Sequence, residues 1–265
     1  MHAGILLALL LLALLLPEIH QPQSYHLFAD GREWLGIPNF WDTASNLPFV
    51  LVGLAGLYVL WRPDSPASVR FRQPAERWAY FAFFAGVVLT GIGSAYYHLD
   101  PSDERLVWDR LPIALISGAL VLAILGDFRE LPAGKRWPPV FDLAATLVVS
   151  AATVVYWAFS PGEGGDLAPY LVLQAYTLLA VIGILIAGTP RYTRRGDVVV
   201  VIGFYCLARV AELLDPQIYA AGRLLSGHTL KHLFAALATA WLLRMILNRS
   251  IGPRLATSRT VVDHP

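Results

Sequence analysis

Long apolar segments dominate this chain, and they constrain its fold more than any other feature. An apolar run of about 18 residues or more is long enough to cross the hydrocarbon core of a bilayer as an α-helix. We predict seven such spans, at approximately residues 44–61, 77–97, 107–126, 139–159, 168–188, 197–214 and 226–247. The sequence therefore predicts an all-α integral membrane protein, built as a bundle of seven transmembrane helices.

The overall composition agrees with a membrane protein. Hydrophobic residues make up 56% of the chain and charged residues 15%, whereas soluble domains average about 25% charged residues. A net charge of +1, without a basic stripe of interleaved aromatic residues, gives no reason to expect a nucleic-acid partner. The single cysteine, Cys206, excludes an intrachain disulfide and a metal site made of several cysteines.

A shorter leucine-rich run precedes these segments. It covers residues 4–16 and ends at Pro17, so it is too short to span comfortably, and it resembles the apolar region of a signal peptide. No arginine or lysine precedes it and no clear cleavage motif follows it, so we favour a short uncleaved anchor over a removed signal. We therefore expect an additional N-terminal apolar helix within residues 1–20, a seven-helix domain at 21–247 and a basic cytoplasmic tail at 248–265.

Basic residues alternate between the connections, and this alternation predicts the orientation. Arginine and lysine gather in the cytoplasmic connections of membrane proteins. Every second connection and the tail hold most of them: Arg62, Arg70, Arg72, Arg77, Arg129, Lys135, Arg136, Arg191, Arg194, Arg195, Arg249, Arg254 and Arg259. The other connections carry only Arg32, Arg105 and Arg223. We therefore expect a cytoplasmic C-terminus. The excess of arginine over lysine is typical of a GC-rich bacterial genome, so the expected location is a bacterial inner membrane.

Five polar side chains fall at one side of this predicted bundle. Ser94 and His98 are four residues apart, as are His228 and His232, and residues at this spacing share one face of a helix. Asp109 opens the helix that follows His98. The expected topology puts all five near the non-cytoplasmic ends of their helices, so we predict that they converge on one site.

This set of residues is suited to zinc. Three neutral imidazoles with an open fourth position form a catalytic zinc site, where the metal lowers the pKa of a bound water to about 7. A nearby aspartate, here Asp109, can then move protons. Histidines near an interface can instead hydrogen-bond to neighbouring helices or lipid headgroups, but we favour the metal because three of them share one side. Ser94 is less suited to be a nucleophile, since no Gly-x-Ser-x-Gly turn surrounds it; its alternatives are a polar role at the site or a small packing residue.

The same motifs resemble those of a known family. The stretch from Phe40 to Asn46, Phe-Trp-Asp-Thr-Ala-Ser-Asn, together with Ser94-x-x-x-His98, Asp109 and His228-x-x-x-His232, is similar to the motifs of the alkaline ceramidases. These belong to a superfamily of membrane hydrolases that also includes the adiponectin receptors. The resemblance extends over about residues 28–247 and implies a seven-helix bundle. One departure is Asp42, where the family pattern has asparagine.

The resemblance implies roles for the site residues and an activity. Zinc would be bound by His98, His228 and His232, and Asp109 and Ser94 would contact the zinc-bound water or the substrate carbonyl. The activity would be amide hydrolysis of ceramide or a related N-acyl lipid into a fatty acid and a sphingoid base, a step of sphingolipid metabolism. Asp109 would accept the water proton and return it to the leaving amine, and Ser94 would donate to the developing oxyanion.

Two other functions are weighed against this enzyme. One is a receptor-like or lipid-sensing zinc protein of the same superfamily with little or no turnover. The other is a zinc or proton transporter, which should carry polar residues at several depths. We disfavour the transporter because the cytoplasmic halves of the predicted helices are nearly all apolar.

The resemblance also implies a calcium site before the first predicted span. Asp30, Glu33 and Asn39 lie in the segment where the ceramidases hold calcium, and oxygen ligands suit this ion. The loop is shorter here, and Asn39 stands where an acidic residue is expected. A calcium site and a solvated acidic loop therefore both stay open.

Other polar and aromatic residues have simpler interpretations. Arg209 and Glu212 are three residues apart and are expected to form an ion pair within their helix rather than to bind headgroups. Lys231 points about 100° away from the histidine face, so we expect its amine to extend to the interface. Several aromatic residues are expected to form an interfacial belt or to line a lipid entrance: Trp34, Trp41, Tyr96, Tyr97 and Trp108.

Overall fold

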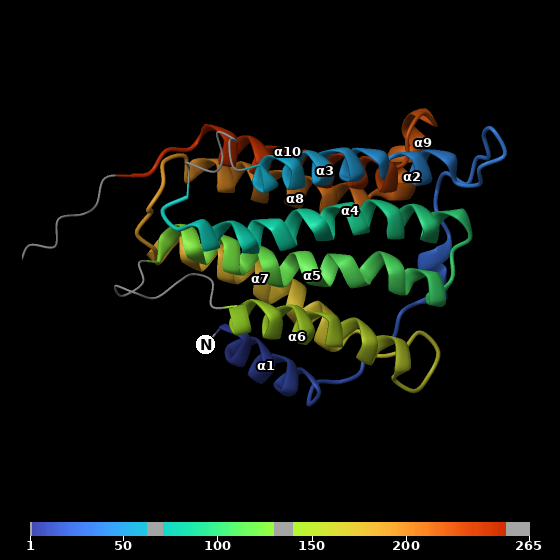
Figure 1. Cartoon of the computed structure of the whole chain (residues 1–265). Helices are drawn as coiled ribbons and strands as arrows, with labels where there is room; N and C mark the ends of the chain where they lie inside the picture. Colours follow the sequence, from blue (N-terminus) through green and yellow to red (C-terminus); the bar gives the residue numbers. More distant parts are fainter. Residues whose placement is uncertain (1, 63–70, 130–139, 253–265) are drawn as a thin grey trace, which may run out of the picture.

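The computed structural model describes residues 2–62, 71–129 and 140–252, and every regular element in these ranges is a helix (Figure 1). The α-helices are α1 (His2–Ala13), α2 (Phe40–Ala44), α3 (Leu47–Trp61), α4 (Arg77–Leu99), α5 (Asp103–Phe128), α6 (Val140–Phe159), α7 (Ala168–Ala187), α8 (Gly196–Leu213), α9 (Asp215–Gly222) and α10 (Gly227–Asn248). Two short 3-10 helices are η1 (Gln23–His26) and η3 (Pro74–Glu76). The predicted all-α class is confirmed.

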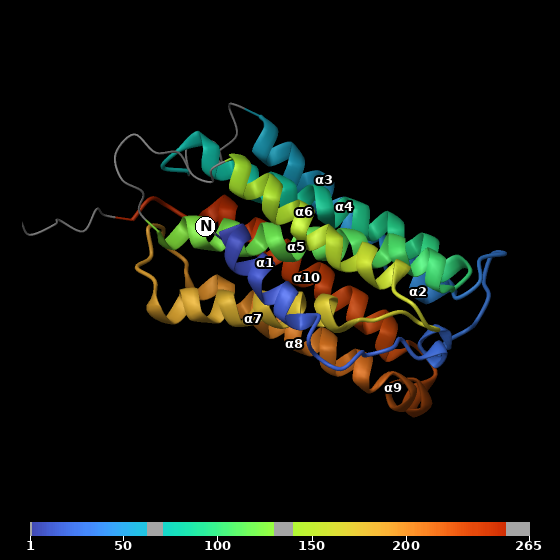
Figure 2. The ribbon, with the colours of Figure 1, turned by 90° about the horizontal axis from the view of Figure 1, so that it is seen from below.

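The long helices lie side by side in a bundle with α5 near its centre (Figures 1 and 2). Helix α5 packs against α4, α6 and α7, while α10 packs against α8 and α3, and α3 packs against α4. This arrangement brings the end of α4, the start of α5 and the start of α10 to the same end of the bundle, near α2 and α9 (Figure 1). The predicted site residues belong to these three helix ends.

Within the described ranges, six helical segments are long and apolar enough to cross a membrane. They are Phe40–Trp61, Pro74–Leu99, Asp103–Phe128, Val140–Phe159, Ala168–Ala187 and Gly227–Asn248. Their outer faces present large apolar side chains, among them Phe141 at 90% exposure and Phe159 at 85%, as a helix facing lipid does. The seventh predicted span corresponds to α8, which is 18 residues long but carries Asp197, Arg209 and Glu212. A crossing by α8, and with it the count of seven, stays a prediction.

The first predicted span begins earlier than residue 44. Helix α2 already starts at Phe40, and α2 and α3 are separated only by Ser45 and Asn46. The Asn46 side chain donates from Nδ2 to the carbonyl oxygen of Asp42 at 2.8 Å, which satisfies a carbonyl group that the end of α2 leaves without a helical partner. The motif around Asp42 is therefore the first part of the span, and it sits at the site end of the bundle.

The N-terminal apolar run forms α1 and packs on the bundle. Helix α1 contacts α6 and α7 and buries Leu6, Leu10 and Ala13. Its 12 residues correspond to about 18 Å of helix, which is shorter than the roughly 30 Å hydrocarbon core. The backbone N–H groups of His2 and Ala3 donate to the Asp142 carboxylate on α6 at 3.3 and 3.0 Å. Its role as an anchor or as a signal stays a prediction.

A buried ionic network occupies the end of the bundle opposite the histidines. The Arg249 guanidinium lies 2.6 Å from the Asp127 carboxylate, which also accepts from the Tyr80 hydroxyl at 2.6 Å. Next to this pair, Arg191 lies 2.9 Å from Glu76. All four charged residues lie just beyond the ends of the predicted spans, so the expectation that the cytoplasmic halves of the spans are nearly all apolar stays a prediction. The charges are tolerated because each acid has a basic partner.

The predicted basic tail at 248–265 is described only as far as residue 252. Within this part, Arg249 turns inward and Gly252 donates its N–H to the Arg191 carbonyl oxygen at 2.8 Å. Several residues used for the orientation lie outside the described ranges: Arg70, Lys135, Arg136, Arg254 and Arg259.

Candidate metal centre

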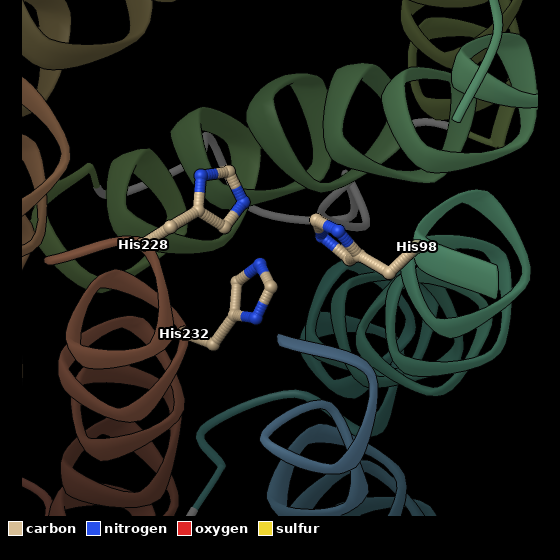
Figure 3. A group of neighbouring side chains, drawn as sticks. All are labelled: His98, His228 and His232. Carbon is tan, nitrogen blue, oxygen red and sulfur yellow. The ribbon is translucent and has the colours of Figure 1, made fainter. Parts of the chain in front are cut away.

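Three histidines lie together at one end of the bundle (Figure 3). His98 comes from the last turn of α4, and His228 and His232 come from the first turns of α10. One ring nitrogen from each lies within 4.8 Å of the other two, and the ring centroids are 4.9 to 5.0 Å apart. All three side chains are buried. The helical spacing predicts this convergence, and the structure contains it.

The chemistry of the cluster fits a metal ion. Both ring nitrogens of His98 are buried and make no hydrogen bond within the described part of the chain. Buried polar atoms without a partner are costly and rare, and a metal ion would provide the missing partner. Imidazole nitrogens bind zinc, copper, iron and nickel. Three histidines without a fourth protein ligand are the donor set of a catalytic zinc site.

The orientation of His232 is set by a residue that sequence reasoning missed. The Ser45 hydroxyl lies 2.8 Å from Nδ1 of His232 and donates to the carbonyl oxygen of Asp42 at 3.1 Å. Since the hydroxyl proton is used toward Asp42, Ser45 accepts a hydrogen bond from Nδ1–H of His232. The other nitrogen of His232, Nε2, then carries the lone pair and faces the other two rings (Figure 3). A partner of this kind on the distal nitrogen orients a metal-binding histidine.

Two carboxylates hold the start of α10 in place. Oδ1 of Asp42 accepts hydrogen bonds from the hydroxyl groups of Ser226 and Thr229 at 3.0 and 2.5 Å. Ser226 is also the N-cap of α10, where its Oγ accepts from the Thr229 N–H at 2.9 Å. Oδ1 of Asp215 accepts from the backbone N–H of His228 at 2.8 Å. The helix that carries two of the three histidines is thus fixed at its first turn.

Ser94 and Asp109 form a buried pair beside the histidines. Their side chains lie next to each other where α4 packs on α5, and the two residues are 2% and 7% exposed. Ser94 lies one turn before His98 on α4. The two helices can approach closely here because Gly93 has no Cβ atom. A Cβ atom at this position would overlap the carbonyl oxygen of Trp108 on α5. The structure therefore brings the predicted proton-transfer residue and the predicted hydroxyl donor into contact.

Lys231 does not extend to the interface, so that expectation is wrong. Its Nζ lies 2.9 Å from the Glu212 carboxylate on α8 and 3.1 Å from Nε2 of His228. The counter-ion on the neighbouring helix explains the inward position. Glu212 also accepts from Arg209, so the predicted ion pair within α8 is confirmed. Nε2 of His228 has a single lone pair, so it serves either Lys231 or a metal ion, but not both.

The three residues predicted for calcium have different partners. Both carboxylate oxygens of Asp30 accept from Arg32, at 2.7 and 2.6 Å. Burial opposes ionisation of Asp30, but the hydrogen bonds and charge of Arg32 outweigh it and lower the pKa of this carboxyl. Nδ2 of Asn39 donates to the His98 carbonyl oxygen at 2.9 Å, and Glu33 is exposed. In residues 2–62 no hydrogen bond links Glu33 to the other two. Calcium binding stays a prediction.

Aromatic residues cover the outer side of the histidines. The Phe28 ring lies 4.6 Å from the His98 ring and 4.8 Å from the His228 ring, centroid to centroid. The neighbouring Ala29 N–H donates to Oδ2 of Asp215 at 3.1 Å, which holds this segment across the site. Four of the predicted belt residues are exposed, namely Trp34, Trp41, Tyr96 and Trp108. Tyr97 is instead buried, with its hydroxyl 2.9 Å from Nδ1 of His26, so its assignment to the belt is wrong.

Neither protein-family models nor curated proteins match this chain. The likeness to the alkaline ceramidases therefore rests on the motifs alone, and these motifs supply the buried histidines, the Ser94–Asp109 pair and the Asp42 contacts described above.

Proposed function

We propose that this protein is a zinc-dependent hydrolase of the membrane that cleaves the amide bond of ceramide or a related N-acyl lipid, releasing a fatty acid and a sphingoid base. One observation carries the proposal. Three buried histidines offer nitrogens within 4.8 Å of one another, and among the described residues His98 has no hydrogen-bond partner for either ring nitrogen. A family relationship to the alkaline ceramidases is part of the same proposal.

His98, His228 and His232 would hold the zinc ion. When bound, zinc polarises a carbonyl group and lowers the pKa of a water molecule. Ser45 keeps His232 oriented for this task through the 2.8 Å contact with Nδ1. Lys231 would leave Nε2 of His228 and keep its ion pair with Glu212.

The Ser94–Asp109 pair would handle the proton and the carbonyl oxygen. Asp109 is buried next to Ser94, so its carboxyl group is close to the Ser94 hydroxyl. It would accept a proton from water and return it to the leaving amine, as a general base and then a general acid. The Ser94 hydroxyl would donate to the oxygen on which negative charge develops.

The location follows from the apolar surface and the basic connections. We propose a multi-pass protein of a bacterial inner membrane in which α8 provides the seventh crossing. The site would face the non-cytoplasmic side, because the basic connections gather at the opposite ends of the helices. The C-terminus would be cytoplasmic. An alkaline phosphatase reporter fused after the last residue should be inactive, whereas an active fusion would reverse this orientation.

Metal analysis and lipid turnover together test the function. Purified protein should contain one zinc ion per chain, and His98→Ala, His228→Ala and His232→Ala should each lose it. The substitution Asp109→Asn should keep zinc, because three histidines and water complete the coordination, but should slow ceramide hydrolysis by about a hundredfold to ten-thousandfold. Asp100→Asn, at an exposed position near the same end, is the matched control and should hydrolyse at the parent rate.

Each contrary result has a separate meaning. Full zinc occupancy in all three histidine variants would reject the metal centre. A zinc-loaded parent protein that cleaves no ceramide or other N-acyl lipid would favour the receptor-like function. Parent activity in Asp109→Asn would reject the proton-transfer role and leave the enzyme in place.

A further inference from the structure

A buried arginine lies next to Asp109 and has an unusual surrounding. Arg110 is 6% exposed and its Nη2 donates to Oε1 of Gln21. Three aromatic rings surround the guanidinium, and the distances from its central carbon to the ring centroids are 4.2 Å for Trp157, 5.4 Å for Tyr170 and 5.5 Å for Tyr25. Such contacts stabilise a cation, but they do not neutralise its charge.

Arg110 differs from the other deeply buried arginines because it lacks an acidic partner. Arg191 is paired with Glu76 and Arg249 with Asp127. No carboxylate lies within ion-pair distance of Arg110 in the described part of the chain, and its Nη1 is buried without any hydrogen-bond partner. A buried charge is costly unless it has partners. Nη1 of Arg110 can therefore donate to a negatively charged group that the described residues do not supply.

Contacts between side chains connect Arg110 to the candidate metal centre. The Tyr25 ring contacts Arg110, and the Tyr25 hydroxyl donates to Glu212 at 3.4 Å. Glu212 in turn accepts from Lys231, which contacts His228. Asp109 precedes Arg110 on α5, and the charge of Arg110 acts on its carboxyl group. A ligand group bound at Arg110 would thus lie near the residues proposed for catalysis.

The neighbouring Tyr170 offers a second polar group. Its ring contacts the Arg110 guanidinium, and its hydroxyl makes no hydrogen bond to any described residue. The Tyr170 hydroxyl is therefore a further donor that no described residue occupies. Planar guanidinium groups bind carboxylate and phosphate oxygens with two parallel hydrogen bonds.

We propose that Arg110 is the anion-binding part of a lipid site beside Asp109. The ligand is a lipid with a carboxylate or a phosphate group, because the remaining walls are aromatic and the site lies within a bundle of apolar helices. The anion site itself does not require the metal. That this anion belongs to the lipid cleaved at the metal centre rests on the proposed function, and it makes the preferred substrate, among the N-acyl lipids named there, one that carries an anionic group.

A pair of lipids that differ only in charge tests this proposal. Binding of N-oleoylglycine, of its neutral methyl ester and of oleyl phosphate to the full-length protein is measured in a non-ionic detergent. The acid should bind at least tenfold more tightly than the ester. A preference for the carboxylate lipid over oleyl phosphate would identify an acyl amino acid as the ligand class, and the reverse would identify a phosphate headgroup. Equal binding of acid and ester by the parent protein would overturn the proposal.

Two variants test whether Arg110 causes the preference for the acid over the ester. In Arg110→Gln the acid and the ester should bind equally. Arg105→Gln is the matched control, because Arg105 lies on the same helix and over a ring, that of Tyr96 at 4.6 Å, but is paired with Asp100 at 3.1 Å. It should keep the tenfold preference. An Arg110→Gln protein that keeps the preference would reject the site, and the comparison of lipids on the parent protein stands even if this variant fails to fold.

Repeating the measurement after metal removal separates this proposal from the proposed function. A carboxylate can bind a zinc ion directly, so the preference must persist in the chelator-treated protein to be assigned to Arg110. A preference that vanishes with the metal would reject the anion site. Absence of zinc or of hydrolysis, with the preference intact, would reject the proposed function alone.

Discussion

The Ser45 hydroxyl lies 2.8 Å from Nδ1 of His232, and this contact joins the motif around Phe40 to the motif around His228. Because Ser45 accepts from Nδ1–H, His232 is held as the tautomer whose Nε2 can bind a metal ion. The two residues are 187 positions apart. The short break between α2 and α3 thus contributes directly to the metal centre.

Removing this hydroxyl should weaken metal binding without unfolding the protein. Loss of a hydrogen-bond partner behind a metal-binding histidine typically lowers metal affinity by about tenfold to a hundredfold, so we expect this loss for Ser45→Ala. Zinc affinity is measured by competition with a chromogenic chelator. The control is Thr239→Ala, also on α10, whose hydroxyl donates only within its own helix, to Ala236 at 2.8 Å. Equal affinities in both variants would contradict the role of Ser45.

Asp42 should tolerate asparagine but not alanine. Its Oδ1 accepts from Ser226 and Thr229, while its buried Oδ2 has no hydrogen-bond partner in the part of the chain that the structure describes. Asparagine keeps the accepting oxygen and replaces the unpartnered one, so Asp42→Asn should leave the melting temperature unchanged or raise it. Asp42→Ala leaves two buried hydroxyl groups without their acceptor, at about 1–3 kcal/mol for each unsatisfied group. If Asp42→Asn melts as low as Asp42→Ala, the charge itself is required.

The ion pair at the far end should be important for stability but not for metal binding. Asp127→Asn removes the carboxylate that pairs with the fully buried Arg249, and breaking a buried pair in this way costs about 3–5 kcal/mol. Asp100→Asn breaks the pair with Arg105 at an exposed carboxylate and should cost about 1 kcal/mol or less. Thermal unfolding in detergent distinguishes the two variants. Both should keep their zinc, since neither touches the histidines.

The Asp30–Arg32 pair should make stability depend on pH in the acid range. The pKa of Asp30 is lowered in the folded protein, where hydrogen bonds and the charge of Arg32 outweigh the effect of burial. A carboxyl group with a lowered pKa stabilises the fold above its unfolded value of about 3.9, and this contribution is lost as the pH falls through the folded value. Asp30→Asn should therefore melt at a slightly lower temperature than the parent at pH 7, because the pair with the solvent-exposed Arg32 stabilises the fold only a little.

The difference between parent and Asp30→Asn should shrink as the pH is lowered below about 4. Melting curves from pH 7 to pH 3 measure it. Glu33→Gln, at an exposed neighbouring position, should melt like the parent at each pH. A gap that stays constant over the whole range would mean that the Asp30 carboxylate does not act through its charge.

Local sequence patterns predict the helices and the three histidines well. The predicted spans at 77–97 and 168–188 correspond to α4 (Arg77–Leu99) and α7 (Ala168–Ala187), because the length of an apolar run is a local property. The spacing of His228 and His232 is local too. That they lie at the same side of the bundle as His98 follows from the direction in which each helix crosses the membrane. The basic connections indicate this direction.

The supporting contacts could not be predicted, because their partners are remote in the chain. Asp42 and Ser226 are 184 positions apart, and Asp127 and Arg249 are 122 apart. A single sequence shows each as an isolated polar residue in or near an apolar run. Lys231 illustrates the resulting error, since a lone lysine is expected at the interface and only the fold reveals Glu212 beside it.

The missing Cβ atom of Gly93 affects how the Ser94 and Asp109 side chains are placed. Since a Cβ atom there would overlap the Trp108 carbonyl oxygen, every amino acid except glycine would push α4 away from α5. The hydroxyl of Ser94 would then move away from the carboxylate of Asp109, although neither residue had changed. Any chain that works by the same chemistry on this backbone must therefore keep glycine immediately before the serine, and Gly-Ser-x-x-x-His is a stricter search pattern than the serine and histidine alone.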